Sequence, residues 1–477
     1  MGAWFSVRWL DRSLVRVWDK SVQTTAAAPP LRDRSSGVER TRARSIAAAA
    51  RIAHRAGSQN GLPVGLDTSD MRYIDCGLLY DGTGREFLSD ARVVIEDGRV
   101  SEVGPVEDVE APADAERIDH SGEAVIPGLI DAHLHIWGTR AMDPFTWVTE
   151  TDRESLRAAR ATVDLRRMLE AGFTTVRDVG SDVAIGLRDA VEEGEIPGPR
   201  IYTSGRAFSQ TGGHGDRHFL PKRWLDTEHD SSIVDGPTAC REGARSRIRE
   251  GADLIKISTT GGVLSEKDEP HHSQFTDEEI RAFTEEAHRV EIPVAAHAQG
   301  APGIKSALRN GVDTIEHGIY LDEEAIDLFH ETDGVMVPTL AIVDRICEHG
   351  EDHGVPEWGM RKAVEVREDH VESIARAYED GIPIAAGTDF IGPELVPHGE
   401  NAMELELFVD AVGMDPVDAL YAATGAAGET VPDDDVGTLT AGDRADLVAL
   451  ADDPREDVSV VRDGIAAVYK GGELVDG

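Results

Sequence analysis

The sequence predicts an α/β fold in which a TIM (β/α)8 barrel is joined to a small β-sandwich built from both ends of the chain. In the middle of the chain, apolar runs of strand length alternate with amphipathic helical stretches, which is typical of parallel βα units. Eight such runs occur, and eight strands close this kind of barrel. The segments on both sides of the middle consist of short strands and turns instead.

Each predicted barrel strand is followed by a helical segment or by a long loop. The helical segments include residues 152–172 and 276–290, whose apolar residues recur with the helical period. A doubly wound open sheet is the alternative, but no GxGxxG turn follows the first strand. The eight predicted strands are residues 124–130, 173–179, 199–204, 253–258, 292–297, 313–317, 335–340 and 382–388.

The two flanking segments resemble each other in their pattern of short strands and turns. Residues 91–104 are predicted to form a hairpin with Asp97-Gly98 at its turn. We therefore expect residues 71–126 and 436–477 to form the two parts of one composite β-sandwich, and residues 127–435 to form the barrel.

The first 70 residues differ from the rest of the chain. They hold 11 basic and 6 acidic residues, and they lack the long apolar core of a secretory signal. Met71 opens a sequence that reads like a natural protein start. One interpretation of residues 1–70 is a start codon assigned upstream of the true one, and the other is a genuine disordered tail.

The composition is strongly acidic, with 90 Asp and Glu against 48 Lys and Arg and a formal net charge of -42. An acid-rich, lysine-poor surface predicts a halophilic protein of a high-salt cytoplasm, and a generally acidic protein is the alternative. Phosphate would be repelled, so we expect no nucleic-acid partner. No apolar run is long enough to predict a membrane span. Three cysteines without a CxxC pair indicate a reducing compartment and argue against a thiolate zinc site.

Histidine and aspartate residues stand where predicted strands end. His133 and His135 are two residues apart, so they point to the same face of the first strand. His297, His317 and Asp389 each terminate a further apolar run. The carboxyl ends of barrel strands meet at one face of the barrel, and imidazole and carboxylate groups bind divalent metals there. The alternative is a set of polar residues that only cap loops.

Lys256 lies within an apolar strand of a chain that has only seven lysines. A buried ammonium group there would be costly and would repel metal ions. A neutral amine could instead react with CO2 to give a carboxylated lysine, which could bridge two metals. The alternative is a lysine whose amine reaches solvent at the end of the strand.

Seven motifs carry a resemblance to a known family: PGLIDAHLH, GFTTVRDVG, TSGRAFSQTGGHGD, GADLIKISTTGGVLS, VAAHAQG, GVDTIEHG and AAGTDF. Over roughly residues 72–477 the chain resembles the amidohydrolase superfamily, and within it the zinc-dependent prolidase and imidazolonepropionase-like group. The resemblance implies a distorted TIM barrel with a composite β-sandwich, a homo-oligomer, and two divalent metal ions, here expected to be Zn2+.

The resemblance also implies a role for each predicted ligand. His133 and His135 would bind the first metal, and His297 and His317 the second. Carboxylated Lys256 would bridge the two ions, and Asp389 would be both a ligand of the first metal and the general base. A hydroxide held between the metals would attack an amide carbonyl, and Asp389 would pass the proton to the leaving nitrogen. This predicts a hydrolase of amide or peptide C–N bonds, for example a dipeptidase of the Xaa-Pro (prolidase) type.

Other polar residues have less defined roles. His214, in a Gly-rich loop after the third strand, is predicted to present its imidazole to the substrate carbonyl, with loop stabilisation as the alternative. Arg206, His271, His272 and His398 are further candidates for lining the pocket, without assigned roles. The expected substrate is a small molecule: a dipeptide, an acyl amino acid or a cyclic amide.

Two other functions stay open. An imidazolonepropionase-like cyclic-amide hydrolase or a deaminase would use one metal, and Lys256 argues against it because one metal needs no bridge. Deaminases of the superfamily often have Glu three residues after the fifth-strand histidine, where this chain has Gly300. A non-catalytic binding protein would have no reason to keep the full set of ligands.

Overall fold

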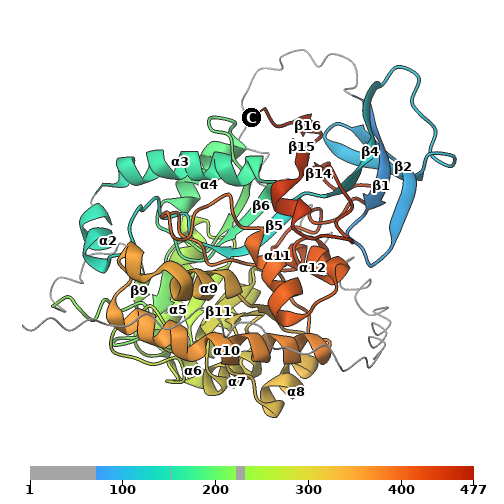
Figure 1. Cartoon of the computed structure of the whole chain (residues 1–477). Helices are drawn as coiled ribbons and strands as arrows, with labels where there is room; N and C mark the ends of the chain where they lie inside the picture. The colour runs from blue at the N-terminus through green and yellow to red at the C-terminus, as the bar shows by residue number, and fades with distance from the viewer. Residues whose placement is uncertain (1–70, 152, 222–230, 477) are drawn as a thin grey trace, which may run out of the picture. The chain divides into compact units, whose positions relative to one another are not determined.

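The computed structural model describes residues 71–151, 153–221 and 231–476, so the predicted extension at residues 1–70 lies outside the described residues. The predicted fold class is confirmed: parallel barrel strands lie beside a mixed β-sheet (Figure 1). Three barrel strands pair in the order β5-β6-β7, and four more in the order β10-β11-β12-β13. They are β5 (Leu129–Leu134), β6 (Phe173–Asp178), β7 (Arg200–Thr203), β10 (Ile255–Ser258), β11 (Val294–Ala298), β12 (Thr314–His317) and β13 (Val335–Val337).

Backbone hydrogen bonds join these two groups into a ring. The Asp253 N–H donates to the Thr203 carbonyl over 2.8 Å, which links β7 to β10. The extended segment 382–390 forms the eighth side of the ring. The Met336 N–H donates to Pro383, and the Ala132 N–H donates to Ala386, at 2.9 and 2.8 Å. The barrel is distorted, because the chain after β7 continues as β8 (Ala207–Ser209), which pairs with β10 and with β9 (Ser231–Ile233).

Helices follow the strands along the chain and surround the ring (Figure 1). Helix α6 shows why they form where they do: Thr276 and Glu279 make a reciprocal capping box at its start, and Ile280, Phe283 and Ala287 bury one face. The longer helices are α2 (Pro144–Thr151), α3 (Glu154–Glu170), α4 (Ala184–Glu192), α5 (Pro237–Glu250), α6 (Asp277–His288), α7 (Ala301–Arg309), α8 (Glu323–Thr332), α9 (Leu340–His349) and α10 (Glu357–Glu379). Shorter turns follow: α11 (Met403–Leu407), the π-helical η4 (Phe408–Val412), α12 (Pro416–Ala422), α13 (Gly425–Gly428) and α14 (Val460–Asp463).

Both ends of the described chain meet in one seven-stranded sheet of order β16-β15-β14-β4-β1-β2-β3. Alternate residues of its central strands face two different cores: Val125 and Leu447 pack within the sheet's own core, while Ile126 and Val448 join the core of the barrel. The strands are β1 (Arg72–Tyr80), β2 (Phe87–Glu96), β3 (Arg99–Pro105), β4 (Glu116–Pro127), β14 (Leu447–Leu450), β15 (Ile465–Lys470) and β16 (Glu473–Leu474).

Two predictions about local structure have different outcomes. The hairpin turn is confirmed, since Asp97 and Gly98 have φ of 51° and 75° between β2 and β3. The start of the first barrel strand is wrong, because residues 124–127 end β4 and the barrel strand begins at Leu129. The chain changes sheets at Gly128, where a Cβ atom would lie 2.1 Å from Thr174 Oγ1.

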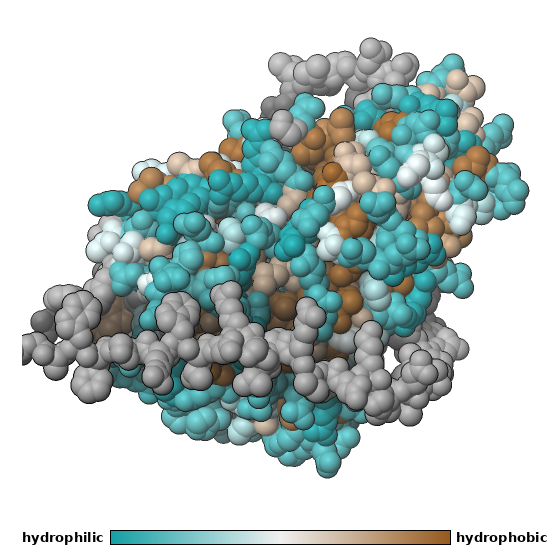
Figure 2. Space-filling model, viewed as in Figure 1, coloured by the Kyte–Doolittle hydropathy of each residue, from teal (hydrophilic) through white to brown (hydrophobic). Residues whose placement is uncertain are grey.

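Hydrophilic residues cover most of the outer helices on the face shown in Figure 2, including α3. Within the described part of the chain, no helix combines the length and the apolar character needed to cross a bilayer.

Candidate active site

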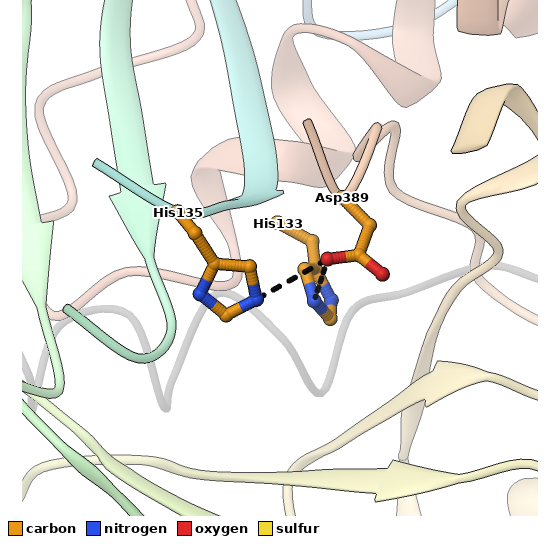
Figure 3. A group of neighbouring side chains, drawn as sticks. All are labelled: His133, His135 and Asp389. Atoms are coloured by element: carbon orange, nitrogen blue, oxygen red, sulfur yellow. Dashed lines mark ion pairs between the residues drawn. The ribbon is translucent and has the colours of Figure 1, made fainter. Parts of the chain in front are cut away.

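His133, His135 and Asp389 come together at the carboxyl end of β5. The Nε2 atoms of His133 and His135 lie 3.5 and 3.2 Å from Asp389 Oδ1 (Figure 3). One ligand atom from each residue lies within 4.8 Å of the other two. Two imidazoles and a carboxylate in this arrangement could hold one divalent metal ion.

The backbone brings Asp389 to the two histidines. The N–H groups of Thr388 and Asp389 both donate to the His133 carbonyl, at 3.0 and 2.7 Å. Asp389 has φ of 58°, a left-handed conformation that is unfavourable for a residue with a Cβ atom. His317, at the end of β12, is left-handed as well, with φ of 74°. Strained backbone at two strand ends is typical of a functional site.

Asp131, which sequence reasoning missed, holds β5 against the eighth side of the barrel. Its Oδ1 accepts from the His133 N–H over 3.0 Å. Its Oδ2 accepts from Thr388 Oγ1 and from Asn401 Nδ2, both at 2.7 Å. The Thr388 N–H is a fourth donor, over 3.2 Å to Oδ1. The side chain is buried, and burial raises the pKa of this carboxyl despite the four hydrogen bonds. Its place two residues before His133 on the same strand face was the available signal.

Glu316 orients His133 through the ring nitrogen that does not face Asp389. Its Oε2 lies 2.5 Å from His133 Nδ1, so Nδ1 donates to Glu316 and Nε2 faces Asp389. The other carboxylate oxygen accepts from Arg177 Nη2 over 2.8 Å. Burial alone would raise the pKa of Glu316, but Arg177 and Lys256 hold it below its usual range. Sequence reasoning missed Glu316, which lies inside the motif that supplied His317.

His297 and His317 line the same cavity as His133 and His135. The ring centroid of His317 lies 5.0 Å from that of His133 and 4.6 Å from that of His297. His297 Nε2 donates to the Gly261 carbonyl over 3.0 Å, so Nδ1 is the nitrogen left for a metal. Burial lowers the pKa of both imidazoles well below the usual value. Neutral imidazoles are the form that binds metals.

Lys256, on β10, points into this cavity and is 4% exposed. Its Nζ has no hydrogen-bond partner among the described residues. Burial lowers its pKa to about 8, an effect that Glu316 and Asp389 partly offset. A buried amine without a partner is costly, and a lowered pKa makes the neutral, CO2-reactive form accessible. The site therefore fits a carboxylated lysine better than a bare ammonium.

The remaining predicted residues differ in whether they line the cavity. His214 lines the cavity, and its ring stacks on that of His297 with centroids 3.9 Å apart. His398 is buried, and its Nε2 donates to the His135 carbonyl over 3.1 Å, so it supports the end of β5. Arg206 is not among the residues that line the described cavity, and neither are His271 and His272, whose side chains are exposed.

The cavity has a volume of about 210 Å³ and walls that are mostly apolar. Arg217, which follows the TGGHGD motif, lines it and was missed by sequence reasoning. Burial lowers the pKa of this guanidinium, and Asp182 offsets part of the effect. The large apolar side chains of the wall include Trp137, Trp147, Phe219, Leu264, Ile346 and Trp358.

Comparison with known proteins shows the family of this chain. Residues 124–475 match the model of the Amidohydrolase family. The chain belongs to this family. It is 33% identical over 434 residues to ochratoxinase of Aspergillus niger, covering 86% of this chain and 88% of that protein. This amidohydrolase is therefore a hydrolase that acts on carbon–nitrogen bonds.

Two further relatives bear on its activity. A crystal structure of a Xaa-Pro dipeptidase with bound methionine superposes with a TM-score of 0.77 at 34% identity, covering 85% of this chain and 100% of that one. Imidazolonepropionase of Paracoccus denitrificans is 26% identical over 401 residues, covering 76% of this chain and 88% of that protein. The predicted resemblance to the prolidase and imidazolonepropionase-like group is thus confirmed.

Proposed function

We propose that this amidohydrolase cleaves the amide bond of dipeptides and N-acyl amino acids with two divalent metal ions, of which Zn2+ suits the imidazole ligands. The observation that carries the proposal is the buried amine of Lys256, which has no hydrogen-bond partner among the described residues and lies in the cavity that the predicted histidine ligands and Asp389 line. A single ion would need no bridging group, whereas a carboxylated Lys256 would join two. The proposed ligands are His133, His135, Lys256, His297, His317 and Asp389.

Bound metals would lower the pKa of water and polarise the scissile carbonyl. The residues of the chain supply the proton transfer and the contacts to the substrate. Burial would raise the pKa of Asp389, but His133 and His135 hold it well below its usual value, so the carboxylate is ionised and can accept a proton from attacking water. Asp389 then returns that proton to the leaving nitrogen. His214 lines the same cavity, where it can contact the substrate.

The cavity wall indicates the substrate class. A dipeptide or an acyl amino acid carries a carboxylate, and Arg217 is a cation that lines the described cavity together with the site histidines. The tryptophan and leucine side chains of the wall favour an apolar acyl side chain. The Xaa-Pro dipeptidase relative supports dipeptide substrates.

The test is a hydrolysis screen of dipeptides, including Xaa-Pro, and of N-acyl amino acids, with added Zn2+ and bicarbonate at high salt. Cyclic amides and aminated heterocycles form the second arm. We expect turnover of dipeptides or acyl amino acids by the wild type and its loss in Lys256→Ala. Activity confined to ring opening or deamination, with one metal per chain, would refute the proposal and favour the one-metal alternative.

A further inference from the structure

His214 is held by two residues of the loop that follows β10. Its Nδ1 lies 3.0 Å from Ser265 Oγ. Ser265 Oγ in turn makes a short hydrogen bond to the Asp268 carboxylate. Ser265 and Asp268 are both buried, with 5% and 4% exposure. The three side chains thus form a continuous relay that ends at the cavity.

The count of protons in this relay sets the state of the imidazole. A serine hydroxyl has one proton. The Asp268 carboxylate and the Gly262 carbonyl, which both lie within hydrogen-bond distance of Ser265 Oγ, can only accept, so Ser265 donates to one of them. The Ser265 oxygen must then accept from His214 Nδ1. The ring therefore carries its proton on Nδ1, and Nε2 is the nitrogen that remains for the substrate.

Hydrogen bonds from Gln274 and from Lys362 hold the loop that contains Ser265 and Asp268. Gln274 Oε1 accepts from the His214 N–H over 2.9 Å, and Gln274 Nε2 donates to Asp268 Oδ2 over 2.8 Å. From α10, Lys362 reaches the loop with no exposed side-chain surface and donates to the Gly262 and Ser265 carbonyls, at 3.1 and 2.7 Å. A Cβ atom at Gly262 would lie 2.5 Å from the His214 ring, so the loop backbone packs directly against the imidazole.

We propose that Ser265 and Asp268 are positioning residues that hold His214 as its Nδ1–H tautomer, so that the resting enzyme presents a hydrogen-bond acceptor, Nε2, to the substrate. The sequence predicts that His214 presents its imidazole to the substrate carbonyl. A carbonyl oxygen only accepts hydrogen bonds, so an acceptor at Nε2 would face a different group of the substrate. The expected effect of Ser265 on kcat rests on the proposed hydrolysis, whereas the tautomer of His214 does not.

A double-mutant cycle tests the coupling between Ser265 and His214, with activity on the best dipeptide substrate as the readout. Ser265→Ala should lower kcat about 10-fold with little change in KM, as for other groups that orient a functional histidine. His214→Asn should lower kcat about 100-fold, and the double variant should be no worse than His214→Asn. Ser306→Ala, which removes a serine–aspartate hydrogen bond on the surface, is the control and should leave both constants unchanged.

Ring 15N chemical shifts of the Zn2+-loaded protein provide a readout that needs no substrate. Besides His133, we expect a histidine signal protonated at Nδ1 that is absent in His214→Asn, and a movement of that proton toward Nε2 in folded Ser265→Ala. Additive losses of kcat, or 15N shifts of His214 that Ser265→Ala leaves unchanged, would overturn the relay. A protein that hydrolyses no amide but shows these shifts would contradict the proposed function and retain the relay.

Discussion

Replacing Glu316 by glutamine should destabilise the protein strongly and weaken metal binding at the same time. The Glu316 carboxylate is fully buried and lies between Arg177, whose Nη2 is 2.8 Å away, and His133. At an effective dielectric constant of about 20, two unit charges at this separation attract by about 6 kcal/mol. Glutamine keeps the shape and removes the charge, which leaves the Arg177 guanidinium buried without its counter-ion.

The expected loss in the free energy of unfolding is about 3–5 kcal/mol, the usual cost of removing one partner of a buried ion pair. Chemical denaturation of the metal-free protein measures it directly. Glu324→Gln is the matched control, since Glu324 pairs with Lys305 and Arg309 at the exposed surface and should change stability little.

The second measurement is the affinity for Zn2+, measured by competition with a chelator. Glutamine can still accept from His133 Nδ1, but a neutral amide raises the basicity of the imidazole less than a carboxylate does, so we expect a loss of about 10-fold or more. If Glu316→Gln loses less than about 1 kcal/mol and binds Zn2+ like the wild type, then the charge on Glu316 supports neither the fold nor the ligand.

Four further predictions concern the site and its acid sensitivity. Lys256→Ala should lower metal content as well as rate, and two metals per chain by elemental analysis in that variant would remove the bridging role. Asp389→Asn should largely abolish turnover while the circular dichroism spectrum stays that of the wild type, and an unchanged rate would place the base elsewhere. Arg217→Met should raise KM for substrates with a free carboxylate more than for their carboxamides, and equal changes would exclude a carboxylate contact. Burial lowers the pKa of both His370 and His398 to about 4, so the unfolded chain binds more protons than the folded one between about pH 6.5 and 4. The free energy of unfolding should therefore fall by up to about 3 kcal/mol per histidine as the pH drops through that range. The fall should be smaller in His398→Gln, and a flat pH profile would contradict this.

Several features of the protein follow from the sequence by itself. The alternation of apolar runs with helical periods predicts the barrel, because hydrophobic burial is local to each element and leaves a period in the chain. The places of His133, His297 and Asp389 at strand ends also predict that they meet, since parallel strands present their carboxyl ends at one face. The Asp97-Gly98 turn is similarly local, because its two left-handed residues are set by adjacent sterics.

Other features depended on tertiary structure. The contact between His133 and Glu316 joins residues 183 positions apart, and no periodicity in the sequence marks it. The loops that bring Ser265 to His214 have no regular pattern, so their contacts follow only from how the whole barrel mouth packs. Residues 124–127 leave the barrel because they pair with β1 and with the C-terminal strand β14, which lies far away in the chain.

The difference between the features that the sequence determines and those that the tertiary structure determines has one physical cause. Secondary structure and the face on which a residue points are determined by neighbours in the chain, and these decided the six proposed ligands. The protonation of each side chain is determined by burial and by charges brought from distant segments. Lys256 depends on both kinds of determinant. The sequence places a lysine on an apolar strand. Only the packed barrel buries its amine without a partner among the described residues and lowers its pKa to about 8.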